Sequence, residues 1–175
     1  QRLNEPWRAL DQFREALSQN PEHEPTIRVL ETLVEQSEYR RTAAELLEPL
    51  YLRRMEWGKV THILEARLDG EDDPTQRMEL LRHLGDVQES HLEDLEGALE
   101  TYGRLFGEDP HDHQSQETLT RLARSLGRWD RLAAIFDKTL RAVEVDDAEM
   151  AALSFTAAEL YDQRLEDLDR SGYFY

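Results

Sequence analysis

The sequence predicts an all-α protein, built as a right-handed solenoid of stacked antiparallel helix hairpins with about ten helices. The first observation behind this fold class is composition: the 175 residues are dominated by Leu, Ala, Glu and Arg and include only 8 glycines and 6 prolines. The four dominant residues all favour helix. The second is that no segment alternates apolar and polar residues for long enough to predict a strand. The third is that similar segments return along the chain at regular intervals.

Turn-forming residues separate the predicted helices. Pro21 follows the first helix and Gly127 ends the seventh, while Asp146 and Asp147 can cap the ninth. Pro49 lies inside the third helix and should kink it or mark a break. The connections are short, which indicates antiparallel neighbours. The predicted helices cover about residues 5–18, 24–36, 39–54, 57–69, 75–90, 92–106, 113–126, 129–143, 148–164 and 166–175.

The strongest signal is an internal repeat. Residues 57–64 return as residues 129–136, which is 72 positions later. Residues 92–95 return as residues 165–168, which is 73 positions later. Such a spacing holds four helices, or two hairpins of about 36 residues each.

Several units in register resemble the tetratricopeptide repeat family. Small residues such as Gly85 and Ala98 let two helices approach closely, and large ones such as Tyr102 and Phe136 fill the space between hairpins. The resemblance covers about residues 41–175 and the first helix, and it implies one solenoid segment over residues 1–175, cut at both ends from a longer array of bacterial type. The residues that carry it are Leu47, Tyr51, Trp57, Val60, Leu64, Leu84, Gly85, Ala98, Tyr102, Pro110, Leu119, Gly127, Trp129, Leu132, Phe136, Ala157, Ala158, Tyr161 and Leu168.

Residues 1–55 depart from the regular pattern. Residues 9–13 of the first helix match residues 98–102 of the sixth, 89 positions later. Only one predicted helix, residues 24–36, then separates the first helix from the unit that starts near Arg41. A two-helix repeat needs an even number of helices there. Either this helix is an inserted element, or residues 24–54 pack as a hairpin of their own.

The resemblance also implies a binding face, because the first helices of successive hairpins in this family line a concave groove for peptides or helices. Family members that clamp the carboxylates of chaperones place basic residues in the groove. This chain has Glu45, Glu117 and Phe155 at such positions, so we do not expect that clamp. The expected groove residues are Glu45, Pro49, Leu52, Arg82, Asp86, Glu89, Glu117, Arg121, Arg124, Phe155, Glu159 and Asp162.

Arg121 and Arg124 belong to the densest basic patch of an acidic chain. One hypothesis is that they hold a carboxylate of a partner by bidentate contacts. The alternative is that they pair with neighbouring acids such as Glu89 and Glu117. We favour the second interpretation.

Charge and hydropathy exclude several classes of partner. There are 21 Lys and Arg against 38 Asp and Glu, a formal net charge of −17. Nucleic acids and anionic membrane surfaces both need a basic footprint, so neither is expected to bind. No apolar run is long enough to enter a membrane, and the lack of a signal segment favours the cytoplasm. The absence of cysteine excludes disulfides and thiolate chemistry.

The sequence offers little catalytic chemistry. His111, Asp112 and His113, close to Asp109, form the one cluster that resembles a metal site, and we expect exposed loop residues there rather than ligands. No phosphate-binding glycine loop and no nucleophile–base pattern is present. We therefore expect no enzyme activity, no metal and no cofactor.

The predicted function is a scaffold that binds a protein or peptide. Two alternatives stay open: a structural subunit of a fixed assembly, or a regulatory arm of an enzyme whose catalytic domain lies elsewhere. The tryptophans Trp57 and Trp129, which occupy matching repeat positions, are expected to pack between hairpins rather than to stack on a ligand.

Overall fold

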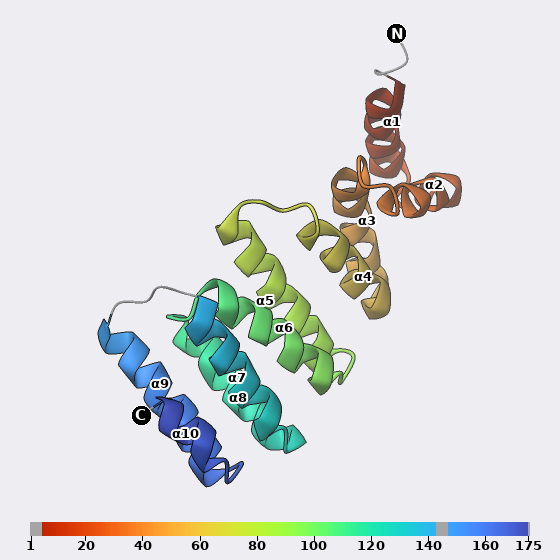
Figure 1. Ribbon diagram of the computed structural model, residues 1–175. Helices are drawn as coiled ribbons and strands as arrows, with labels where there is room; N and C mark the ends of the chain where they lie inside the picture. Colours follow the sequence, from red (N-terminus) through yellow and green to blue (C-terminus); the bar gives the residue numbers. More distant parts are fainter. Residues whose placement is uncertain (1–4, 143–146, 175) are drawn as a thin grey trace. The chain divides into compact units, whose positions relative to one another are not determined.

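The structure is a computed structural model that describes residues 5–142 and 147–174. All regular elements in these two stretches are α-helices, which confirms the predicted all-α class (Figure 1). The chain divides into two compact units, which we call unit 1 (residues 1–93) and unit 2 (residues 94–175). Unit 1 contains α1 (Glu5–Gln19), α2 (Glu24–Val34), α3 (Arg40–Arg54), α4 (Trp57–Leu68) and α5 (Pro74–Ser90). Unit 2 contains α6 (Leu95–Glu108), α7 (His113–Leu126), α8 (Trp129–Ala142), α9 (Asp147–Gln163) and α10 (Leu168–Phe174).

Aspartates fix the starts of three helices. The side chains of Asp73, Asp94 and Asp112 each accept a hydrogen bond from a backbone N–H in the first turn of α5, α6 and α7. The cap at Asp94 explains why α6 begins at Leu95 and not at residue 92 as predicted. The predicted cap at Asp146 lies outside the described residues. The third predicted helix does not break at its proline, since α3 runs continuously through Pro49.

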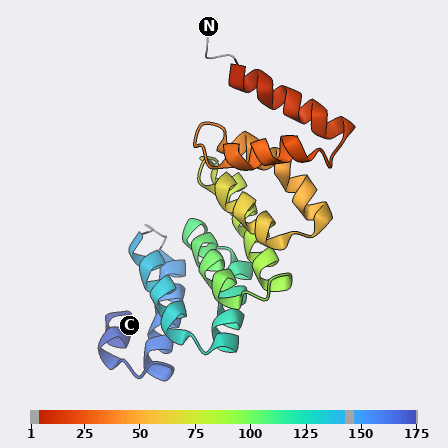
Figure 2. The ribbon, with the colours of Figure 1, turned by 90° about the vertical axis from the view of Figure 1, so that its right-hand side faces the viewer.

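In unit 1, consecutive helices pack on one another from α2 to α5. Ile27 and Leu30 of α2, Leu47 of α3, Leu64 of α4 and Leu81 of α5 are all buried. The helix α1 makes few contacts, with α2 and α3. The open question about residues 24–36 is thereby answered: α2 is no insertion but packs on α3 as a hairpin, as Figure 2 also shows.

In unit 2, α6 packs on α7 and α8, α8 packs on α9, and α10 folds back on α9. The rings of Phe106 on α6 and Phe136 on α8 meet edge to face, with 5.0 Å between their centroids. Such a geometry is favourable for aromatic pairs. Gly103 allows α6 and α8 to approach, because a Cβ atom there would lie 2.8 Å from Cδ1 of Ile135.

The predicted repeat is visible in burial. Each buried residue of α2 has a buried counterpart in α6 72 positions later, so α2 is the counterpart of α6 in the repeat. Four of the five buried residues of α3 have buried counterparts in α7 at the same spacing, whereas the counterpart of Ala44 is the half-buried Gln116. The matched pairs are Thr26 and Ala98, Ile27 and Leu99, Leu30 and Tyr102, Val34 and Phe106, Ala43 and Ser115, Leu47 and Leu119, Leu50 and Leu122, and Tyr51 and Ala123.

The repeat is also visible in the backbone of the turns. Met55 and Gly127, 72 positions apart, both have positive φ after α3 and α7. Glu93 and Glu166, 73 positions apart, have positive φ after α5 and α9. The chain therefore repeats as a block of four helices, α2–α5 and then α6–α9, with two alternating kinds of turn.

Candidate functional site

The candidate site is the exposed face of α7 in unit 2. A regular apolar stripe holds this helix against its unit: Leu119, Leu122 and Ala123 are fully buried. Gly127, with φ +68°, ends the helix and directs the chain into α8. Because side chains three and four positions apart share one side of a helix, the burial of this stripe leaves the opposite stripe at the surface.

A hollow of about 280 Å³ lies on this exposed face. Three of the predicted groove residues line it, and two neutral residues, Gln116 and Thr120, complete it. The Thr120 hydroxyl donates a hydrogen bond to the Gln116 carbonyl at 2.9 Å. All five lining side chains are polar or charged: Gln116, Glu117, Thr120, Arg121 and Arg124.

The charges of the hollow are only partly paired inside the protein. Within the described part of unit 2, the side chains of Glu117 and Arg124 make no hydrogen bond or ion pair, either with each other or with another residue. The expected pairing of the two arginines with neighbouring acids is therefore absent between Glu117 and Arg124, whereas Arg121 and Glu89 each have an interaction within the chain. An exposed pair between helix neighbours is worth only a few tenths of a kcal/mol, so its absence costs little.

The other predicted groove residues do not line this hollow. Glu45 on α3 is exposed and pairs with Arg41 at 3.2 Å, and Leu52 on the same helix is half-buried. On α9, the Phe155 side chain is 53% exposed. The remaining predicted residues are placed on α5 (Arg82, Asp86, Glu89) and on α9 (Glu159, Asp162).

Sequence reasoning missed Gln116 and Thr120. Uncharged polar residues on a helix surface carry no distinctive signal in sequence. Their positions could have been found from periodicity, because Gln116 and Thr120 lie four residues apart and flank Glu117 and Arg121.

The two repeat tryptophans stack on the protein itself. The Trp57 ring lies parallel to the ring of His91, with 3.7 Å between centroids and 4° between planes. The Arg164 guanidinium lies over the Trp129 ring at 4.8 Å. His91 and Arg164 are 73 positions apart, so each tryptophan meets the equivalent position of its own unit. Each contact covers one face of an indole ring, the kind of surface on which an aromatic ligand would stack.

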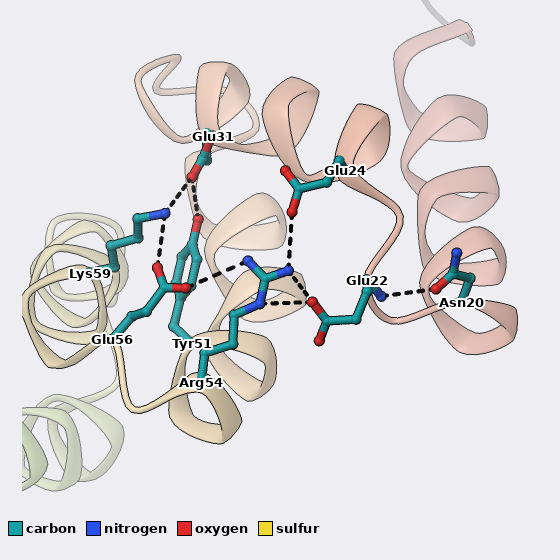
Figure 3. Close-up of polar contacts among 8 residues, drawn as sticks. All are labelled: Asn20, Glu22, Glu24, Glu31, Tyr51, Arg54, Glu56 and Lys59. Atoms are coloured by element: carbon teal, nitrogen blue, oxygen red, sulfur yellow. Dashed lines mark hydrogen bonds and ion pairs between the residues drawn. The ribbon is translucent and has the colours of Figure 1, made fainter.

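A network of charges joins α2, α3 and α4 in unit 1 (Figure 3). Arg54 pairs with Glu22, Glu24 and Glu56, the last at 3.5 Å. Tyr51 donates to a Glu31 carboxylate oxygen at 2.6 Å, and Lys59 contacts that oxygen at 3.2 Å.

The Tyr51–Glu31 contact perturbs both partners. The hydrogen bond from Tyr51 lowers the pKa of Glu31, and Lys59 acts in the same direction. Burial and the neighbouring Glu31 carboxylate raise the pKa of Tyr51. Tyr51 is fully buried and every partner is supplied by the chain, so this network stabilises the helix junction.

The histidine-rich turn before α7 has a structural use. Asp112 caps α7 and Asp109 accepts a hydrogen bond from the His111 N–H at 3.0 Å. Among the described residues, no group of three or more His, Asp or Glu side chains could hold a metal ion.

In the same part of the chain, no helix has the length and hydropathy to cross a membrane.

No protein-family model matches this chain, and no curated protein matches it. The resemblance to tetratricopeptide repeats therefore stays a prediction. The repeat itself does not depend on that resemblance, because the burial and turns of the two four-helix blocks show it directly.

Proposed function

We propose that this chain binds other proteins without catalysing a reaction, and that the exposed face of α7 is a contact surface. The observation that carries the proposal is the hollow on α7 with its charged and polar lining. Pockets that enclose a small molecule are usually mostly apolar and about 300–1,000 Å³. A hollow of about 280 Å³ that is open to solvent and lined by polar and charged residues is smaller than such pockets and suits side chains of a protein partner instead.

The family resemblance supports the same surface. It assigns the binding face to the first helices of the hairpins, and α7 is one of these if the units start near Arg41, as the resemblance implies. Glu117, Arg121 and Arg124 were expected in the groove on that ground alone, and these three residues line the hollow. The predicted long array and its concave face remain part of this proposal.

A filled hollow tests the proposal. Peptides would be selected from a displayed library on the full chain, and their affinity would be measured by fluorescence anisotropy for Thr120→Trp and for the control Gln114→Trp. Gln114 is exposed on α7 but does not line the hollow. We expect Thr120→Trp to weaken most selected peptides about tenfold or more, and Gln114→Trp to leave them unchanged. Peptides that bind both variants and the unmodified chain equally would refute the proposal.

A further inference from the structure

The exposed stripe of α7 carries an ordered set of charges. Glu117, Arg121 and Arg124 follow one another at intervals of four and three residues and line one hollow. These intervals place them on one side of the helix. From the amino to the carboxyl end of α7, the stripe therefore presents one negative and then two positive side chains.

These arginines are exceptional in this chain. Acidic residues outnumber basic ones by 38 to 21, so the net charge of the chain disfavours the approach of carboxylates. Arg121 and Arg124 are both exposed, and they meet in one hollow. A guanidinium presents a planar fork that fits a carboxylate through two hydrogen bonds.

Arg121 already has an interaction within the chain, which a partner carboxylate would have to share or replace, but the other two charges are available without breaking an existing pair. Glu117 and Arg124 have no side-chain hydrogen bond or ion pair within the described part of unit 2. A partner that supplies opposite charges to them therefore adds contacts and removes none. The neutral side chains of Gln116 and Thr120 oppose neither sign of charge.

We infer, on the basis of the proposed function, that the occupant of the hollow is a helix of a partner protein with two carboxylates followed by one cation. An antiparallel partner helix meets Arg124 first, then Arg121 and then Glu117. Its matching sequence places acidic residues at positions i and i+3 and a lysine or arginine at i+7. An acidic residue four positions before a basic one also stabilises the partner helix itself.

The test uses the full chain and two synthetic peptides of about 15 residues, long enough to hold some helix in water. One peptide carries Glu, Glu and Lys at positions i, i+3 and i+7, and the other carries Lys, Lys and Glu at the same positions. We expect the acidic-first peptide to bind about tenfold more tightly in fluorescence anisotropy. This preference should shrink as ionic strength rises from about 50 to about 500 mM.

Matched variants assign the preference to the hollow. Arg124→Glu should remove the affinity advantage of the acidic-first peptide. Arg124→Gln should reduce this advantage about threefold, and it places no negative charge near the carboxyl end of the helix. Arg131→Glu is the control, because Arg131 is exposed on α8 and does not line the hollow. It should change the preference less than about twofold. Circular dichroism checks that each variant is folded.

The outcomes separate this inference from the proposed function. Suppose that Thr120→Trp weakens the library peptides, but that these peptides show no preference for acidic residues and bind the Arg124→Glu variant normally. The inference is then wrong and the proposed function stands. If Thr120→Trp changes the affinity of no peptide, the inference and the proposed function are both wrong. If both synthetic peptides bind equally at low salt, the ordered charges do not select the partner and the inference is overturned.

Discussion

The two four-helix blocks, α2–α5 and α6–α9, share a frame and differ at the surface. Most of their buried positions match along the chain, but several equivalent surface residues of α3 and α7 differ. Where α7 has Arg121 and Arg124, α3 has Pro49 and Leu52, 72 positions earlier. The pair Glu45 and Glu117 is the same in both. The repeat thus preserves packing, whereas the charges that could select a partner belong to one copy.

The turns show the same contrast. The turn after α3 forces Met55 to positive φ, and the turn after α7 uses Gly127 there. The tryptophan that follows stacks on His91 in one block and on Arg164 in the other. Equivalent positions therefore keep their geometry while their chemistry changes, and each difference can be tested by exchanging residues.

The largest effect is expected in the shared core. Phe136→Ala in α8 and Leu64→Ala at the equivalent place in α4 should each lower the free energy of unfolding by about 3–4 kcal/mol, because both side chains are fully buried. Urea denaturation measures the loss, and hydrogen exchange locates it in unit 2 or unit 1. A loss of less than about 1 kcal/mol in the free energy of unfolding at either position would contradict the claim that the two blocks share equivalent buried positions.

The next effect distinguishes the blocks, because Tyr51 has Ala123 as its counterpart. Tyr51→Phe should lower the free energy of unfolding by about 1 kcal/mol at neutral pH. The loss is smaller than for a fully buried charged hydrogen bond, because the Glu31 side chain is 40% exposed.

The same contact predicts a pH dependence. The lowered pKa of Glu31 contributes stability that is present above its ordinary pKa of about 4.3 and is lost as pH falls through the folded-state value. Tyr51→Phe should flatten this acid branch in urea titrations at several pH values. An unchanged acid branch would show that the hydrogen bond does not stabilise ionised Glu31.

Effects of similar size, but opposite in sign to each other, are expected at the two turns. Met55→Gly should stabilise the protein by about 1 kcal/mol, because glycine adopts positive φ without steric cost and the Met55 side chain is 70% exposed. Gly127→Ala should destabilise it by about 1 kcal/mol, even though no atom lies within 4 Å of the added Cβ. Thermal unfolding of both variants tests the prediction, and shifts of the same sign would refute the equivalence of the turns.

The smallest effect concerns the tryptophan stacks. His91→Arg should give unit 1 the guanidinium that Arg164 supplies in unit 2, with a gain of about 0.5 kcal/mol in the free energy of unfolding at pH 8. Arg164→Ala should lower the free energy of unfolding by a similar amount. Trp fluorescence during urea unfolding follows both changes. If His91→Arg destabilises the chain at this pH, the two stacks are not interchangeable.

Much of the fold could be predicted from sequence, because local signals fix the helices. Aspartate caps, Gly127 and a strongly helical composition placed every helix within a few residues. The position of α2 in the repeat could not be settled, since the apolar pattern of the first helix also matches that of α6. Packing decides it, because α2 and not α1 buries the residues that match α6.

Less of the candidate site could be predicted. Periodicity and family resemblance placed Glu117, Arg121 and Arg124 on one face, but nothing in the sequence indicated that this part of the expected groove is hollowed. The Tyr51–Glu31 contact was also missed, because it joins two helices across 20 residues of sequence. Contacts of this kind follow from how helices pack, which a one-dimensional pattern does not contain.

The most direct measurement of the central claim is a cross-linking map. Selected peptides that carry a photoreactive phenylalanine analogue would be irradiated with the full chain, and the adducts would be located by mass spectrometry. We predict adducts in residues 113–126 of α7 and few on the equivalent face of α3, around Glu45 and Leu52. Adducts concentrated on α3, or none on α7, would contradict the account.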